Sequence, residues 1–355
     1  MATKHYVVGD SEVQKLWSKR VQTEALLNTQ IGKFLGDDDK SLGCIETSTT
    51  KESGDRVTTT LRMRLTGAGV TELQPLEGNE EALVTYNDNV VINEIGHAVR
   101  RHKGISDQRI PWSVGMQNND ALVDWWAERL DKWAFNHLCG YVKETDTRYT
   151  GFNATIAPST GRHIWCSTDH TTDASLDSDD IFALTHLDRA REIATTGSSS
   201  GHPRIRPIKA AMAGGGYGDM YVAFLHPTQV TQLRRSTSQW TDIQNSLLQG
   251  GYIKENPIFN GALGVYNKVV LHESEFCTPG LDSLSDVSNT RRAVFCGAQA
   301  LTVAFGKGYS ASKGKITEET FDYDREAGQS LLSVSGMKKT QFNSVDYGTI
   351  VLSSY

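Results

Sequence analysis

The sequence predicts an α+β protein, in which strands and helices follow one another without regular alternation. An alternating segment at residues 56–65 and shorter segments near the C-terminus have the period of strands. Residues 114–138 and 178–195 instead repeat their apolar side chains every three or four positions, as helices do. Because these segments do not form a βαβ succession, we do not expect a regular parallel sheet.

The composition is that of a folded protein with room for about two domains. The chain has 355 residues, of which 38% are hydrophobic and 22% charged. Its net charge of −6 argues against a dedicated nucleic-acid-binding protein, which would normally be basic. No segment approaches the ~18 apolar residues of a membrane span, and residues 1–17 lack a signal-peptide core. The five cysteines are scattered, which favours reduced thiols over a disulfide framework.

Residues 11–30 predict an amphipathic helix, and residues 54–95 predict a hairpin. The first strand of the hairpin, 56–65, has apolar residues on one face and arginines and threonines on the other. A connection of roughly 17 residues follows, which is long for a compact domain and suggests a function. The second strand begins at residue 83. Two strands alone are marginal in water, so we expect a neighbouring subunit to cover this hairpin.

An extended piece at 95–102 precedes a long helix at 114–138, which ends at Cys139 and Gly140. At ~1.5 Å per residue this helix would be about 37 Å long, which suggests a structural backbone element. Aromatic residues at helical spacing are mostly core residues, so we assign Trp125, Trp126 and Trp133 to packing. One stripe of the helix recurs at steps of three and four: Leu122, Trp126, Leu130, Trp133, His137 and Tyr141.

The second half of the chain predicts shorter elements. They are a helix at 178–195 with acidic residues in its first turn, a strand at 221–225, a helix opened by Pro227, a strand at 264–273, a buried helical or extended segment at 292–305, and strands at 331–334 and 349–353.

Several motifs resemble reactive sites but lack the required context. Ser199 lies in a G-x-S-x-G pattern, yet no buried strand precedes it and His202-Pro203 follows. His163, Cys166 and His170, with Asp169, form a single loose cluster, whereas zinc sites pair two knuckles. The phosphate-loop-like segment 308–315 has the wrong spacing, and the glycines of 214–218 lack the dinucleotide pattern. We therefore expect no catalytic residue, metal or cofactor.

The hairpin carries the candidate functional residues instead. Its arginines precede a loop rich in glutamate, and opposite charges on a projecting element can set the register between repeated subunits. The residues that we expect to contact a neighbouring subunit are Arg62, Arg64, Leu65, Val70, Leu73, Leu76, Glu77, Glu80 and Glu81.

The order of these segments resembles the major capsid proteins of tailed phages, in the N4-like branch. The resemblance covers residues 10–355 and rests on the co-occurrence of several segments. They are GDRVTTTLRMRLTGAGVTELQPLEGNEEAL, VVINEIGHAVRRHKGISDQRIPW, ALVDWWAERLDKWAFNHLCG, YVAFLHPTQVTQLRR, GALGVYNKVVLHES, AVFCGAQALTVAFGKG and KKTQFNSVDYGTIVLSSY.

The resemblance implies an HK97-type capsid fold. Its expected parts are an N-terminal arm at 1–50, an extended hairpin called the E-loop at 51–100, a peripheral domain at 101–185 with a spine helix at 113–140, an axial domain at 186–304, and return strands of the peripheral domain at 305–355. The residue patterns alone predict the hairpin and the long helix, whereas the capsid shell is implied only by the resemblance.

The resemblance also implies the function. The chain would be a non-enzymatic major capsid protein that self-assembles through hexamers and pentamers into the icosahedral head around double-stranded DNA, without sequence-specific binding. Scaffolding, portal and decoration proteins are possible further partners, and assembly would take place in the host cytoplasm before the protein becomes part of the virion. The alternatives are an encapsulin-like compartment shell and, from another class, a soluble hydrolase using Ser199 or a metal.

Overall fold

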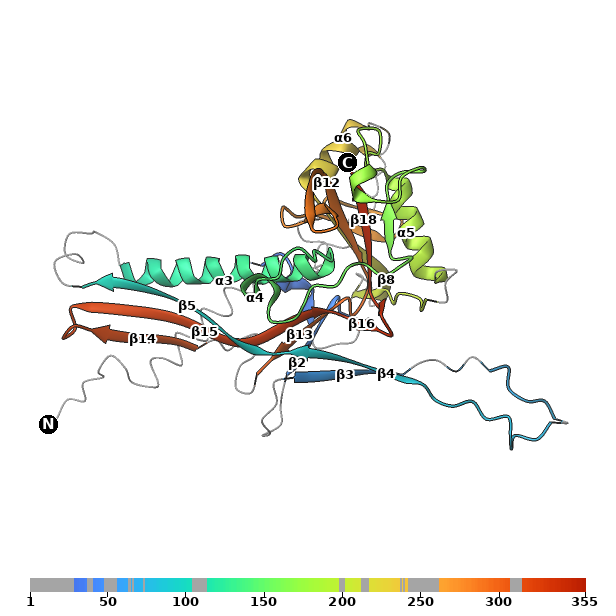
Figure 1. Cartoon of the computed structure of the whole chain (residues 1–355), viewed down its shortest axis with the longest axis horizontal. Coiled ribbons are helices and arrows are strands. Elements are labelled where there is room, and N and C mark those ends of the chain that lie inside the picture. The colour runs from blue at the N-terminus through green and yellow to red at the C-terminus, as the bar shows by residue number, and fades with distance from the viewer. Residues whose placement is uncertain are drawn as a thin grey trace.

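The body of the protein contains two large β-sheets and one long helix, which lies along the first sheet and reaches the second with its C-terminal end, and a two-stranded hairpin projects from this body (Figure 1). The structure is a computed structural model that describes residues 29–36, 41–47, 56–62, 65, 67–72, 74–103, 114–197, 202–211, 217–236, 238, 240–241, 262–306 and 315–355. The predicted helix at 11–30 lies outside these residues except for its last two positions. No helix in the described part of the chain is long and apolar enough to cross a membrane.

The six-stranded sheet is organised around its longest strand, β15. The strand order is β1-β2-β13-β15-β14, and β5 pairs with the first part of β15. β15 therefore lies between β5 and β14 at its outer end and beside β13 at its inner end. The strands are β1 (Leu35–Gly36), β2 (Gly43–Thr47), β5 (Asn93–His102), β13 (Leu301–Phe305), β14 (Lys315–Phe321) and β15 (Glu326–Lys339).

The long helix α3 (Val114–Leu138) lies along this sheet and confirms the predicted helix at 114–138 (Figure 1). The stripe found in the sequence is its buried face, with Trp133 and Leu138 fully buried. Trp125 is half-buried and stacks on His97 of β5 at 4.7 Å between ring centroids. The helix ends at Leu138, and Gly140 two residues later has a φ of 65°, which is costly for residues with a Cβ.

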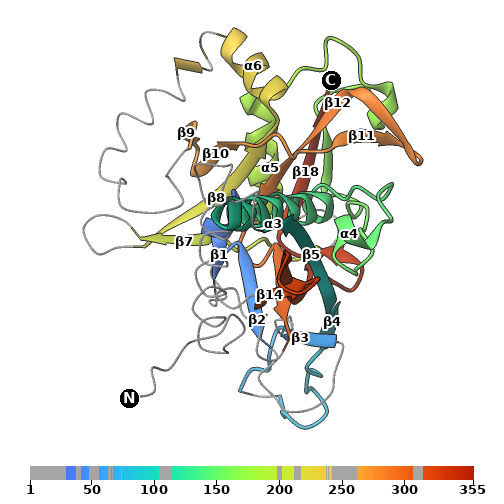
Figure 2. The ribbon, with the colours of Figure 1, turned by 90° about the vertical axis from the view of Figure 1, so that its left-hand side faces the viewer.

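The eight-stranded sheet has both of its faces buried. Its order is β6-β18-β12-β8-β10-β9, with β11 beside β12 and β7 beside β8. Val222 and Phe224 of β8 pack in the cluster that contains the end of α3, whereas Tyr221 and Ala223 pack in a second cluster with α5 (Leu184–Thr196) and α6 (Pro227–Arg235). Figure 2 shows α3 nearly end-on, with β12 and β18 of this sheet above it and β2 of the other sheet below it. The strands are β6 (His163–Trp165), β7 (Ile208–Ala211), β8 (Tyr217–Leu225), β9 (Gly264–Tyr266), β10 (Val269–Glu273), β11 (Pro279–Asp282), β12 (Ser285–Cys296) and β18 (Thr349–Ser354).

A buried ion pair joins the end of α3 to this second sheet. Arg292 of β12 donates through Nη1 to the carbonyl oxygens of Cys139 (3.3 Å) and Gly140 (3.1 Å). Its Nη2 lies 2.7 Å from Oδ2 of Asp173, in the short helix η2 (Asp173–Ser175). Asp173 also accepts from the backbone amide of Leu281 (2.9 Å) and from Nε1 of Trp165 (3.1 Å).

Two sequence predictions need correction, and a third is made more specific. The helix predicted at 178–195 begins only at Leu184. The acidic residues predicted for its first turn therefore lie before the helix, in the preceding turns. The single strand predicted at 264–273 is the hairpin β9–β10, because Asn267 and Lys268 have positive φ values and reverse the chain. The segment 292–305 is extended, but it leaves one sheet at Cys296 and enters the other at Leu301.

The other predicted elements are confirmed as strands or helices. Residues 95–102, 221–225, 331–334 and 349–353 lie in β5, β8, β15 and β18, and Pro227 opens α6. The four cysteines whose side chains the structure describes are buried and free, as expected.

The proposed domain limits stay a prediction. Both sheets combine distant parts of the chain, and the last strand, β18, pairs with β12 and β6.

Candidate assembly interface

The projecting hairpin comprises β3 (Arg56–Arg62), β4 (Thr85–Val91) and the loop between them. The two strands pair antiparallel, with Arg56 opposite Val91 and Arg62 opposite Thr85. Residues of β3 alternate between exposed and half-buried, as the sequence predicted. Because no third strand joins β3 and β4 in the described part of the chain, the hairpin depends on contacts at its root.

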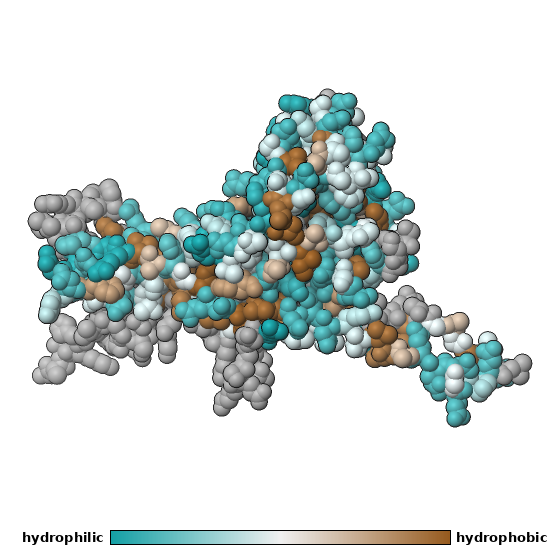
Figure 3. All heavy atoms as spheres, in the orientation of Figure 1, coloured by the Kyte–Doolittle hydropathy of each residue, from teal (hydrophilic) through white to brown (hydrophobic). Residues whose placement is uncertain are grey.

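Apolar side chains accumulate on the hairpin where nothing in the described chain covers them. Leu65 is 55% exposed, Leu76 74%, Leu83 56% and Val84 47%. Figure 3 shows brown, apolar atoms on the projecting part of the molecule, beside the body and again further out. Large exposed apolar side chains gathered on one projection indicate a surface that another molecule covers.

The loop is partly organised by its own glutamates. Glu81 accepts from the backbone amide of Gly67 (2.6 Å) across the loop, and Glu80 accepts from that of Gly78 (2.8 Å). Gly78 needs the freedom of glycine, since its φ is 90°. Between Arg64 and His97 the sequence has no Lys, Arg or His, so the glutamates give the loop a uniformly acidic end.

The residues predicted for the contact with a neighbour have different environments. Arg62, Leu65, Leu76, Glu77, Glu80 and Glu81 are exposed, Val70 is half-buried, and Arg64 and Leu73 lie outside the described residues. Glu80 and Glu81 hold the loop together, so they are less available for an outside partner than Glu77. A contact of these residues with a second copy stays a prediction.

The root of the hairpin is fixed by residues that the sequence analysis missed. The side chain of Asn153 accepts from the backbone N–H of Val91 and donates to its carbonyl oxygen, both at 2.9 Å. Oδ1 of Asp88 pairs with the ammonium of Lys338, and Oδ2 accepts from the backbone N–H of Gln341 (3.1 Å). Asp88 occupies an inward position of β4 between Tyr86 and Val90, and a charged residue there is the signal that could have revealed an anchor.

Two further features let the root lie close to the body. A Cβ on Gly336 of β15 would lie 2.0 Å from the carbonyl oxygen of Val91, so only glycine allows this approach. Val90 and Ile92 pack with Ala304 in a small buried cluster, to which Val57 and Val334 add partly buried side chains. The hairpin is thus bound firmly at one end and uncovered at the other.

The alternative reactive sites do not assemble. Nε2 of His163 lies 2.7 Å from Ser353 Oγ, and burial lowers the pKa of His163 to about 4. Burial also raises the pKa of the Cys166 thiol, so that a thiolate ligand is disfavoured. His170 instead pairs with Asp180 at 2.7 Å.

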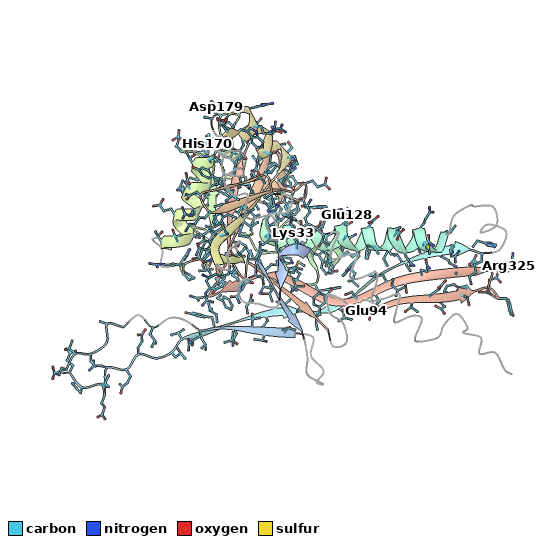
Figure 4. All side chains as sticks on the ribbon, turned by 180° about the vertical axis from the view of Figure 1, so that it is seen from behind. Lys33, Glu94, Glu128, His170, Asp179 and Arg325 are labelled. Carbon is cyan, nitrogen blue, oxygen red and sulfur yellow. The ribbon has the colours of Figure 1, made fainter. Side chains whose placement is uncertain are left out.

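His163, Cys166 and His170, which the sequence analysis weighed as a loose metal cluster and set aside, do not come together as one set of ligands. In the described residues, the donor atoms that lie within 4.8 Å of one another belong to His170, Asp177 and Asp180, which are exposed or half-exposed. Figure 4 shows His170 and Asp179 near the top of the lobe that rises above the long helix and the hairpin. Ser199 and residues 308–314 lie outside the described residues.

Comparison with known proteins decides between the candidate functions. A family model described as phage capsid protein matches residues 5–355. The chain belongs to the phage capsid protein family. As a member it is a component of the phage virion and associates with copies of itself in a capsid lattice.

Individual phage capsid proteins match over almost their whole length. The major capsid protein of Pseudomonas phage KPP25 is 27% identical, over 96% of this chain and 94% of that protein. The capsid of Ralstonia phage GP4 has a TM-score of 0.81 and 27% identity, over 100% of this chain and 98% of that one. The cyanophage Pam1 capsid has a TM-score of 0.68 and 18% identity, over 99% and 96%, and this likeness shows the fold alone.

The phage capsid fold and the function of a major capsid protein, both predicted from the sequence, are thereby confirmed. The N4-like branch is not tested by these matches and stays a prediction. The family also favours a viral shell over the encapsulin-like compartment and the hydrolase.

Proposed function

We propose that the projecting hairpin is the contact by which copies of this phage capsid protein close an icosahedral head around double-stranded DNA. The observation that carries this proposal is the asymmetry of the hairpin. Its root is anchored by buried polar groups and a small apolar cluster, whereas its outer part exposes Leu65, Leu76 and Leu83. A neighbouring copy that covers these side chains would supply the missing core.

The energy available from this contact is moderate for one copy and large for a closed shell. A fully buried Leu or Val side chain contributes about 1.5–3 kcal/mol, so four half-exposed ones contribute roughly 5 kcal/mol. The loss of translational freedom and the ordering of the loop offset much of that gain. Since each copy in a shell is held on several sides, weak single contacts add up to a stable assembly.

The charge of the chain is consistent with a wall that encloses DNA without binding it tightly. A protein that neutralises phosphates needs a basic surface, whereas this chain carries a net charge of −6. Hexamers and pentamers of this chain are the expected building units, with assembly in the host cytoplasm. Scaffolding, portal and decoration proteins are expected further partners, and the absence of catalysis is an expectation from the structural family.

Deletion of residues 66–82 tests the proposal. The deletion removes Leu76 and the glutamates but leaves β3, β4 and the root anchors in place. We expect a folded protein by circular dichroism that forms no closed particles by electron microscopy. A matched control replaces residues 66–82 with a Gly/Ser linker of equal length, which keeps the reach of the loop but not its side chains.

Closed shells of normal yield from both variants would show that residues 66–82, with Leu76 and the glutamates, do not make the contact. Particles that contain a protein cargo instead of DNA, found by mass spectrometry, would support the encapsulin-like alternative.

A further inference from the structure

The root of the projecting hairpin is held at two separate points of one strand. The first is Val91, bound by Asn153, and the second is Asp88, bound by Lys338 and by the backbone of Gln341. The two points are three residues apart, which is about 10 Å along a strand. One anchor leaves a strand free to swing about it, whereas two anchors at this separation fix its direction.

Asn153 takes the place of a missing strand. The N–H and C=O groups of one residue point to the same side of a strand, and both groups of Val91 bind the one amide side chain at 2.9 Å. Lys338 extends this edge, since its ammonium also lies 3.4 Å from the carbonyl oxygen of Asn89. Side chains of the body thus bind the free edge of β4 at Val91 and Asn89.

Asn153 is itself positioned by α3. It follows the short helix α4 (Thr147–Thr150), whose backbone is bound by three side chains of α3. Trp133 Nε1 donates to the carbonyl oxygen of Arg148 (2.7 Å), and Asn136 Nδ2 to that of Tyr149 (3.0 Å). His137 Nε2 donates to that of Thr150 (2.7 Å). Asn153 is 7% exposed and also donates to the carbonyl oxygen of Gly151 (3.2 Å).

We propose that Asn153 and Asp88 form a two-point clamp that sets the angle at which the hairpin leaves the body, with α3 as its reference. Asn153 and Asp88 are positioning residues, because neither has to touch the neighbouring copy. The consequence for the shell rests on the proposed function of the hairpin. If the angle is fixed before assembly, all copies present their loop in one direction and the particles have one size.

The clamp can be measured on the full chain before assembly. Spin labels on cysteines at Glu77 in the loop and Glu128 on α3, both exposed, report the angle as a distance distribution by double electron–electron resonance. Cys44 is replaced by Ser, and the four described native cysteines are buried. We expect Asn153→Leu to broaden the distribution at least twofold. Asn153→Asp, which keeps the acceptor for Val91 N–H but loses the donor, should broaden it less.

The matched control is Asn87→Leu, because Asn87 is an exposed asparagine of β4 that binds neither anchor, and it should leave the distribution unchanged. Lys338→Met removes the second anchor and should broaden the distribution even if Asn153→Leu does not fold. An unchanged width in a folded Asn153→Leu or Lys338→Met variant overturns the clamp.

Electron microscopy of assembled particles separates the clamp from the function of the hairpin. The expected result is a wider range of diameters for Asn153→Leu than for Asn87→Leu. A broadened distance distribution with uniform particles would overturn the effect of the angle on the shell. Failure of the unmutated chain to form particles would contradict the proposed function and leave the distance measurement valid.

Discussion

Replacing Asp173 by asparagine should destabilise the body more than any surface substitution of the same kind. Asp173 is 3% exposed and is the acidic partner of Arg292, which is 6% exposed. Burial raises the pKa of Asp173, but the charges of Arg292 and His163 and the amide of Leu281 outweigh it and hold that pKa below its usual value. The carboxylate is therefore ionised in the folded protein.

The magnitude follows from what the substitution leaves behind. Asp173→Asn has nearly the same shape, so it creates no cavity, but the guanidinium of Arg292 stays buried without a counter-charge. Breaking a buried ion pair in this way costs about 3–5 kcal/mol. A protein's total unfolding free energy is only about 5–15 kcal/mol, so the variant should be marginal.

Urea unfolding of the unassembled chain, followed by tryptophan fluorescence, measures this cost. With a slope of about 3 kcal/mol per molar urea, the midpoint should fall by about 1 M or more. The control is Asp286→Asn, which breaks the exposed pair with Lys143 and should cost no more than about 1 kcal/mol. The double variant Asp173→Asn/Arg292→Met removes the unpaired charge and should recover at least half of the loss.

Two results would refute the reasoning. The first is a midpoint of Asp173→Asn equal to that of Asp286→Asn, and the second is a double variant that is less stable than the single one.

Two further predictions concern charge and pH. Reversal of Arg62 and Arg64 to glutamate should lower particle yield and make it salt-sensitive, with an unchanged circular dichroism spectrum of the unassembled chain; loss of that signal would mean that the strand is needed for folding. His137→Gln should flatten the dependence of stability on pH, because burial lowers the pKa of His137 from 6.5 to about 4. As the pH falls, the unfolded chain therefore binds the proton before the folded protein does. The unmutated protein should lose up to about 3 kcal/mol of unfolding free energy between the unfolded pKa of 6.5 and the folded pKa of about 4. Equal slopes of the urea midpoint between pH 7 and pH 4.5 in both proteins would contradict this assignment.

The elements that could be predicted from the sequence are those whose apolar side chains repeat regularly within one continuous segment. The face of α3 from Leu122 to His137 lies within one continuous segment, and so does the alternation of β3. The segment 292–305 could not be divided, because its apolar residues are buried in both sheets and only the packing shows that Gly297 begins the crossing. A Cβ there would lie 2.5 Å from the carbonyl oxygen of Arg206.

The candidate interface was predictable in its exposed part and not at its root. Leu65 and Leu76 follow from the excess of apolar residues on a hairpin with too little core of its own. Asn153 and Lys338 lie 62 and 250 positions from their partners in β4, and no local pattern links residues at such separations. The resemblance to phage capsid proteins supplied the fold and the function but no residue of the root.

β4 continues into β5 with Ile92 as the only residue between them, and ten residues of β5 pair with β15. Tension on the hairpin, from a neighbour pulled outward as the head fills, would act along β5 and parallel to its ladder with β15. A ladder loaded in shear must lose many hydrogen bonds together, whereas one that is peeled from its end loses them singly. If a neighbouring copy holds the hairpin as proposed, the chain would transfer mechanical load from its projection into its longest strand in the orientation that best resists rupture.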